Sequence, residues 1–217
     1  MEVVLKVTPH LLQGIYLTIY LSIAGMALSL GVGFIGGMIR SARVPLLSPF
    51  LGAYVAFVRG TPFLLVIFIM YYVLPAFGLR LGALSAGVLG LIVHEGAYMT
   101  EIVKGGIDAV DRGQDEAAKA LGLTYMQKMR HVILPQAVRL ILPPLAGQFV
   151  LLVKATSVVS LIGITEVTRV GQQLTQRGEH TFITFGMVAL FYFLVCYPLV
   201  KFSDRMERRL SKWIETV

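Results

Sequence analysis

Residues 7–39 read VTPHLLQGIYLTIYLSIAGMALSLGVGFIGGMI and contain no Asp, Glu, Lys or Arg. A helix needs roughly 20 apolar residues to cross the hydrocarbon core of a bilayer, so this run is long enough to span one. A cleaved signal peptide has an apolar region of about 7 to 15 residues behind a basic start. This run is longer and follows Met1 and Glu2. It therefore predicts a membrane-spanning helix.

Further uncharged runs lie at residues 60–79, 81–94, 140–153 and 181–200. The composition agrees with a membrane location, since 56% of the residues are hydrophobic and only 14% are charged. Lipid offers the backbone no hydrogen bonds, so we expect helices rather than strands. We predict a single all-α integral membrane domain over residues 1–217, with about five transmembrane helices. The spans are expected near residues 12–38, 60–77, 82–104, 138–160 and 182–202.

The basic residues predict the orientation of the chain, because short loops rich in Lys and Arg stay in the cytoplasm. One side of the predicted topology collects Arg40, Arg43, Arg112, Lys119, Lys128, Arg130, Lys201, Arg205, Arg208, Arg209 and Lys212. The other side has Lys6, Arg80, Arg169 and Arg177. This bias places the N-terminus outside and the C-terminus in the cytoplasm. The net charge of +7 is then explained by topology and anionic lipid rather than by nucleic acid.

A polar stretch, EAAKALGLTYMQKMRHVILP at residues 116–135, lies between two of the apolar runs. Asp111 is a suitable start for a first short helix, and Gly122 can adopt the left-handed conformation that stops it. Thr124 with Gln127 then starts a second helix, which Pro135 is expected to limit. The outline is also that of a DNA-binding helix-turn-helix, but the flanking membrane spans disfavour that reading.

This stretch also offers an apolar contact surface on the cytoplasmic side. The surface is predicted to consist of Leu121, Leu123, Met126 and Met129. A membrane chain with such a loop presents it to a soluble partner.

The same stretch resembles the EAA loop of ABC-importer permeases. The matching positions are Glu116, Ala117, Ala118, Gly122, Val132, Leu134 and Pro135. The family more often has Ile at the position of Val132. Other elements narrow the resemblance to permeases for polar amino acids, with the type I (MetI-like) architecture. Residues 57–62, FVRGTP, are similar to the family's FRGTP element. The other elements are GAY at 96–98, EI at 101–102, GGI at 105–107, and Lys154, Thr156 and Ser157. Ala155 departs from the Asp or Asn common in the family.

The resemblance implies a set of partners in the inner membrane of a bacterium. It implies a second permease subunit, identical or paralogous, a cytoplasmic ATPase dimer that binds ATP and Mg, and an external solute-binding protein. The cytoplasmic loop, at about 108–135, would couple to the ATPase through Glu116, Ala117, Ala118, Leu121, Gly122 and Met126. This chain has no GxxxxGK[ST] phosphate loop. We therefore expect a transporter subunit that has no catalytic residues, cofactor or metal of its own.

Polar residues inside the predicted spans form a candidate solute pathway, because ionisable groups at membrane depth are costly and usually functional. His94, Tyr98 and Glu101 recur at i, i+4 and i+7, which places them on one stripe. The candidate residues are Arg59, Gly60, Thr61, His94, Glu95, Tyr98, Glu101, Lys154, Thr156 and Ser157. A purely structural alternative pairs Glu101 with Lys104 or Arg59.

A second function remains open from the residues alone. In an ion- or proton-coupled secondary transporter, His94, Glu95 and Glu101 would titrate or bind cations. The lack of an internal repeat and the large amphipathic loop count against it. The sequence leaves open which amino acid is moved and whether the two membrane subunits are identical.

Overall fold

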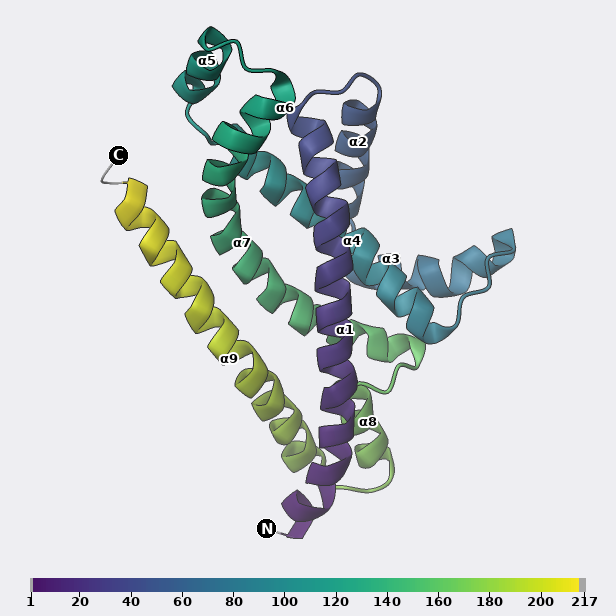
Figure 1. Cartoon of the computed structure of the whole chain (residues 1–217). Helices are drawn as coiled ribbons and strands as arrows, with labels where there is room; N and C mark the ends of the chain where they lie inside the picture. The colour runs from purple at the N-terminus through teal and green to yellow at the C-terminus, as the bar shows by residue number, and fades with distance from the viewer. Residues whose placement is uncertain (1, 215–217) are drawn as a thin grey trace.

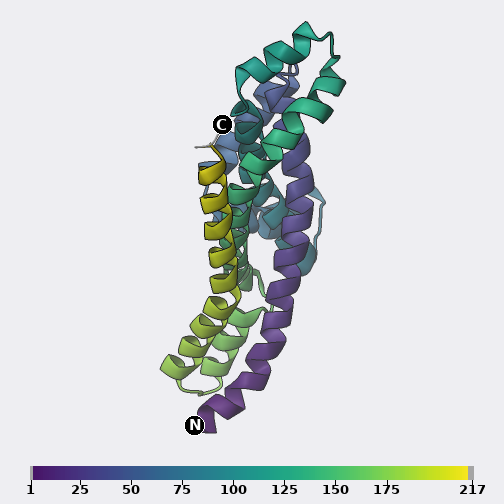
Figure 2. The ribbon, with the colours of Figure 1, turned by 60° about the vertical axis from the view of Figure 1, so that its left-hand side comes forward.

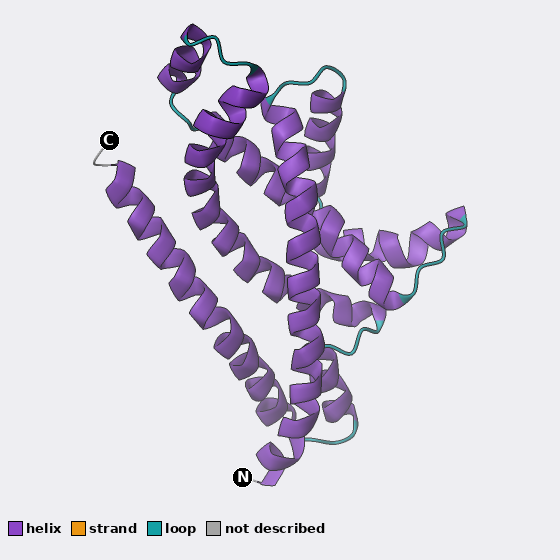
Figure 3. Ribbon diagram, in the orientation of Figure 1, coloured by secondary structure: helices purple, strands orange, loops and turns teal. Residues whose placement is uncertain are grey.

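The computed structural model describes residues 2–214, and these residues form helices joined by short loops (Figure 3). No strand occurs in this described part of the chain, so the predicted all-α class is confirmed. The long helices are α1 (Glu2–Ser41), α4 (Ala83–Asp108), α7 (Leu134–Ala155) and α9 (Thr181–Ile214). The shorter ones are α2 (Leu47–Arg59), α3 (Phe63–Phe68), α5 (Arg112–Ala120), α6 (Tyr125–Lys128) and α8 (Val167–Gln176).

The molecule is elongated, and its two ends differ in kind (Figure 1). Helix α1 runs along most of its length, with the N-terminus at the end that carries α8. The short helices α5 and α6 lie at the opposite end, and the last turns of α9 approach that same end (Figure 2). The N-terminus and the polar loop are therefore at opposite ends, as the predicted topology requires.

Three helical stretches among the described residues are long and apolar enough to cross a membrane, namely Val3–Ser41, Tyr125–Ile162 and Thr181–Arg208. A fourth is possible if Leu47–Arg59 and Phe63–Phe77 form one broken span. The sequence predicts about five spans, which is more than this criterion supports. The difference lies in α4, the predicted third span, which carries His94 and Glu95 in mid-helix and is not among the apolar stretches.

The predicted span at residues 60–77 is wrong in its boundaries. Helix α2 ends at Arg59, and α3 begins at Phe63 at an angle of 106° to it. The intervening Pro62 is extended, with ψ at 136°, which breaks the helical backbone. After α3 the chain continues through a π-helical turn, Ile69–Val73, and a 3₁₀ turn, Leu74–Phe77. The break places Arg59 at the end of a helix.

Helices α1 and α4 approach each other closely along a row of glycines. A Cβ atom at Gly33 would lie 2.8 Å from the carbonyl carbon of Met99, and one at Gly37 would lie 2.6 Å from Cβ of Val103. Small residues allow such backbone contact between membrane helices, where packing and not the hydrophobic effect drives association. This contact fixes the position of α4, which carries four of the ten candidate pathway residues, namely His94, Glu95, Tyr98 and Glu101.

Helix α8 is fixed to the bundle at the end opposite the loop. The buried carboxylate of Glu166 accepts hydrogen bonds from the backbone N–H of Thr168 (2.9 Å) and Arg169 (2.8 Å), which caps the helix. It also accepts one from the Tyr192 hydroxyl in α9 (2.8 Å). One side chain thus joins α8 to α9.

We predict that Gly33→Val destabilises the protein, because its branched side chain meets backbone atoms of α4 that cannot move aside. Overpacking of this kind costs about 1 to 3 kcal/mol. Gly31→Val is the matched control, since a Cβ there meets no atom within 4 Å. The melting temperature of the purified protein in detergent should fall for Gly33→Val and stay near wild type for Gly31→Val. Equal melting temperatures for the two variants would contradict the close α1–α4 contact.

Candidate functional site

A cleft of about 390 Å³ lies between α4, α7 and the end of α2. Three of the predicted pathway residues line it together, namely Arg59, Tyr98 and Glu101. The rest of its wall comes from Ile102 of α4 and from Pro144, Gly147, Gln148 and Leu151 of α7. The α7 residues recur at i, i+3, i+4 and i+7, so one face of that helix closes the cleft.

Glu101 is held by two arginines from different helices. Arg40 of α1 donates a hydrogen bond to its Oε2, and Nη1 of Arg59 lies 3.8 Å from the same oxygen. The expected alternative pairing with Arg59 is therefore present. The pairing with Lys104 is wrong, since Lys104 instead binds Asp108 one turn further along α4, at 2.6 Å. Arg40, which sequence reasoning did not assign to the site, is the direct partner.

Arg59 is the accessible cation of the cleft, with 45% of its side chain exposed. Its guanidinium carbon lies 5.3 Å from the centre of the Tyr98 ring, within cation–π range. Tyr98 in turn contacts His94, and His94 contacts Phe63 of α3, with ring centres 5.1 and 4.8 Å apart. The predicted stripe thus exists, but His94 lies behind the cleft wall among aromatic rings.

Glu95 is buried beneath the cleft and does not line it. Its Oε2 accepts a hydrogen bond of 2.7 Å from Nε2 of Gln148, and its Oε1 lies 3.2 Å from Nδ1 of His94. Both carboxylate oxygens therefore have a nitrogen partner. This arrangement links α4 to α7 at the level of the cleft.

The other predicted pathway residues lie away from the cleft lining. Gly60 caps α2, and the Thr61 hydroxyl donates to the Phe57 carbonyl at 2.8 Å. Thr156 and Ser157 donate to the carbonyls of Val153 and Lys154, both at 2.7 Å, where α7 turns into a 3₁₀ helix. These hydroxyls satisfy backbone groups at helix ends, and the exposed Lys154 is one turn beyond Leu151 on α7.

Sequence reasoning missed Gln148, although a signal for it exists. Gln148 is the only strongly polar side chain in the uncharged run at residues 140–153. An amide at that depth needs a partner, and the position is about two and a half turns from Arg139, well inside the predicted span. Arg40 gave a weaker signal, because it reads equally well as a basic residue at a membrane surface.

The polar loop begins as the sequence predicts. The Asp111 carboxylate accepts from the Gly113 N–H at 2.7 Å and caps α5. Gly122 has φ +73°, which confirms the left-handed helix stop. Thr124 and Gln127 form the reciprocal capping box of α6. These local signals determine the helix–turn–helix outline.

Pro135 does not limit the second helix. It lies in the first turn of α7, and the chain continues through a π-helical turn, Met129–Ile133, into that helix. The wider turn and the first-turn position tolerate the missing N–H of proline. The polar loop is therefore continuous with a helical stretch that is long and apolar enough to cross a membrane.

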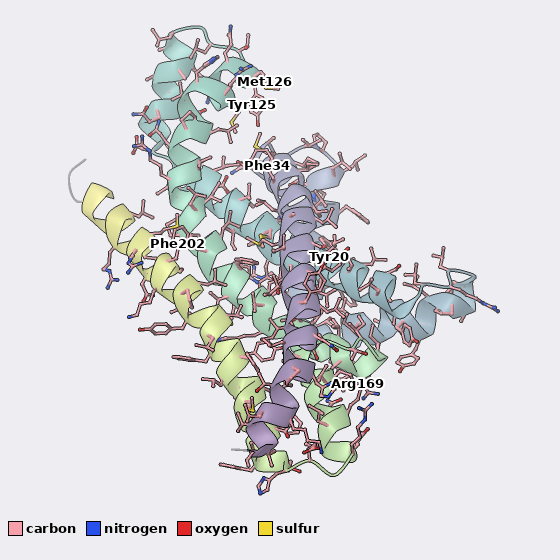
Figure 4. The ribbon with its side chains drawn as sticks, turned by 60° about the horizontal axis from the view of Figure 1, so that its bottom comes forward. Tyr20, Phe34, Tyr125, Met126, Arg169 and Phe202 are labelled. Carbon is pink, nitrogen blue, oxygen red and sulfur yellow. The ribbon has the colours of Figure 1, made fainter. Side chains whose placement is uncertain are left out.

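The exposed apolar surface of the loop is smaller than predicted. Leu121 is 78% exposed and Met126 is 69% exposed, whereas Met129 packs into the core and Leu123 is half-buried. Tyr125 and Met126 lie at this end of the molecule, far from Arg169 on α8 (Figure 4). Among the remaining predicted coupling residues, Glu116 and Ala117 are exposed and Ala118 is buried.

Asp115 connects α5 to α6. Its Oδ2 lies 2.5 Å from Nζ of Lys119, and its Oδ1 accepts a hydrogen bond from Lys128. The hydrogen bonds from Lys119 and Lys128 hold the pKa of Asp115 below its ordinary value. The ionised carboxylate therefore holds the two short helices at a fixed angle.

The chain is similar to known membrane transport proteins over almost its whole length. Residues 29–215 match the family model described as "Binding-protein-dependent transport system inner membrane component". The chain is 35% identical over 200 residues to a probable glutamine ABC transporter permease protein, GlnP, of Bacillus subtilis (strain 168), covering 91% of this chain and 92% of the relative. It is also 35% identical over 204 residues to a probable glutamine ABC transporter permease protein, GlnM, of the same organism, covering 93% of each.

A solved structure agrees with these relatives. The crystal structure of an amino acid ABC transporter with histidines superposes with a TM-score of 0.88 at 32% identity, covering 94% of this chain and 96% of that chain.

We predict that Glu101→Gln lowers the stability of the protein, because Arg40 then loses its counter-charge in a largely buried position. The expected cost is about 1 to 3 kcal/mol, less than for a fully buried pair since Glu101 is partly exposed. Arg59→Gln should change stability by no more than about 0.5 kcal/mol, because its longer contact is exposed. Thermal melting of both purified variants measures this. The double variant Arg40→Met with Glu101→Gln should recover part of the loss.

Proposed function

This chain belongs to the family of binding-protein-dependent transport system inner membrane components, and we propose that it is the permease subunit of an ATP-driven importer of polar amino acids. The observation that carries the proposal is the pairing of Arg59 and Glu101 in one open cleft between α2, α4 and α7. An amino acid is a zwitterion, and this cleft offers one accessible charge of each sign.

The geometry suggests how the cleft would hold such a solute. Arg59 has N–H donors that its 3.8 Å contact with Glu101 leaves available, and a guanidinium binds a carboxylate strongly in a dry site. Glu101 is 34% exposed and accepts one short hydrogen bond from Arg40, so it can also accept from an ammonium group. The Tyr98 ring beside Arg59 provides an apolar surface for the remainder of the solute.

The polar loop would couple this cleft to an ATPase. Leu121 and Met126 form an exposed apolar pair on a short helical hairpin, which suits insertion into a groove of a soluble protein. We infer that closure of an ATPase dimer moves the hairpin and alternates access to the cleft. This chain would catalyse no covalent step. ATP and Mg would be bound by the partner.

Two further partners complete the proposed importer. A second membrane subunit would face the open side of the cleft, and two glutamine permease relatives with different names in one organism are consistent with paired paralogues. An external solute-binding protein would deliver the amino acid, since the matching family is binding-protein-dependent. We place the assembly in the inner membrane of a bacterium.

The proposal is tested at Gly122, where the positive φ makes the hairpin turn. A β-branched side chain there is strained, so Gly122→Val should displace α6 from the ATPase. We expect normal membrane insertion but at least a tenfold fall in solute-stimulated ATP hydrolysis by the reconstituted complex, about 1.4 kcal/mol of lost coupling. Gly186→Val is the matched control, since that glycine lies in α9 with open space around it. Normal stimulated turnover in Gly122→Val would refute the coupling role of the loop.

The proposed orientation gives a second prediction. In a Cys196→Ser background, cysteines at Met126 and Arg208 should be protected from a membrane-impermeant maleimide in intact cells. A cysteine at Arg177, which is exposed just beyond α8 at the other end of the molecule, should be labelled. In cells that lack the ATPase partner, which would otherwise cover this residue, opening the cells should make the Met126 position reactive. External labelling at Met126 would reverse the orientation proposed here.

A further inference from the structure

Gln148 is the one amide in the wall of the cleft, and a hydrogen bond to the buried Glu95 fixes the orientation of that amide. The residue is buried, with an exposed fraction of 8%, and its Nε2 donates to Glu95 at 2.7 Å. An ionised carboxylate can only accept hydrogen bonds. The second oxygen of Glu95 already faces Nδ1 of His94 at 3.2 Å, so the carboxylate is engaged on both sides by nitrogen.

The carbonyl oxygen of Gln148 must therefore point away from Glu95. Among the residues whose side chains the structure describes, the only fully buried side-chain polar atom that lacks a hydrogen-bond partner is Oγ1 of Thr184. Oε1 of Gln148 makes no hydrogen bond among those residues, so it must be accessible rather than sealed in the core. Gln148 lines the cleft, and the cleft is where that oxygen is reached.

We propose that Glu95 is a positioning residue that locks the Gln148 amide with its carbonyl oxygen toward the cleft, so that the cleft selects amino acids whose side chain donates an N–H hydrogen bond. This inference rests on the proposed function of the cleft as a solute site. It assigns the three contacts by chemistry. Arg59 takes the solute carboxylate, Glu101 takes the ammonium, and Gln148 reads the side chain.

The selectivity follows from an unpaired acceptor. A side chain with an amide or ammonium group satisfies Oε1 of Gln148, whereas a carboxylate of the same shape places two acceptors face to face. Sites that are built to hydrogen-bond a group discriminate strongly against an isostere that lacks it, because a buried polar atom is left without a partner. L-glutamine and L-glutamate γ-methyl ester have uncharged side chains of similar shape, and only the glutamine side chain donates an N–H hydrogen bond. They are therefore the probes of choice.

Glu95→Gln is the informative substitution, because it preserves shape and removes the constraint. A glutamine at this position can donate as well as accept, so the Gln148 amide can rotate and present its NH₂ group to the cleft. The preference for L-glutamine over L-glutamate γ-methyl ester should then fall at least about tenfold. Gln148→Leu should abolish the preference by removing the oxygen. Thr100→Val, at another buried polar residue of α4, is the control that should leave it unchanged.

The measurement is competitive equilibrium binding of labelled L-glutamine against unlabelled L-glutamate γ-methyl ester, on the permease purified with its ATPase and without the external binding protein. The ratio of the two affinities reports the amide orientation, whereas general destabilisation lowers both affinities together. An unchanged ratio in Glu95→Gln, with a changed ratio in Gln148→Leu, would overturn the positioning role of Glu95. An unchanged ratio in both variants would overturn the selectivity assigned to Gln148. Binding of neither probe to the wild-type complex would overturn the cleft as the solute site, which is the failure of the proposed function itself.

Discussion

Two carboxylates inside a hydrophobic bundle impose the arrangement of the helices around α4. A charged side chain in the hydrocarbon region is unstable unless other groups of the protein satisfy it. Glu101 is satisfied by Arg40 of α1 and Arg59 of α2, and Glu95 by Gln148 of α7. Breaking such pairs is far more costly than never having formed them. The three helices that supply partners are therefore required to lie against α4, and the cleft forms where their polar groups meet.

The same helix connects the cleft to the loop at the other end. Met129 and Ile133, which follow α6, pack in one buried cluster with Val103 and Ile107 of α4. These α4 residues begin less than one turn beyond Glu101, so the polar pair and the loop share a rigid element. A movement of the hairpin would therefore be transmitted through packed side chains, because a close-packed interior cannot absorb it locally. The continuous path from α6 through the π-helical turn into α7 supplies a second connection, to the wall that carries Gln148.

Local chemistry was predictable from sequence, and relations between helices were not. The caps at Asp111 and Thr124 and the left-handed Gly122 depend on side chains within a few residues, so their patterns determine the outcome. The all-helical membrane class follows from the uncharged runs for the same reason. The predicted second span began at residue 60, whereas the broken helical stretch in the structure begins at Leu47, about a dozen residues earlier. The sequence did not indicate α2 as part of a span, because this helix is amphipathic and not uniformly apolar. Gln148 and Arg40 acquired their roles only through helices distant in sequence.

The pairing of Lys104 shows why such relations escape sequence reasoning. Glu101 and Asp108 lie three residues before and four residues after Lys104, and both spacings allow a contact on a helix. The local geometry therefore leaves the choice open. Arg40 of α1 determines which acid Lys104 binds, because its guanidinium pairs with Glu101 and leaves Lys104 to pair with Asp108. The Ser41 hydroxyl also donates a hydrogen bond of 2.8 Å to Asp108. The glycine row that brings α1 against α4 is thus a condition for the charge arrangement in the cleft.

A secondary transporter would need Glu95 or Glu101 to gain and release a cation in each cycle. Both carboxylate oxygens of Glu95 already face nitrogen atoms, of Gln148 and His94, so Glu95 has no free oxygen for a coupling cation. Glu101 is partly exposed in the cleft and binds both arginines through one oxygen, which suits it to contact a solute.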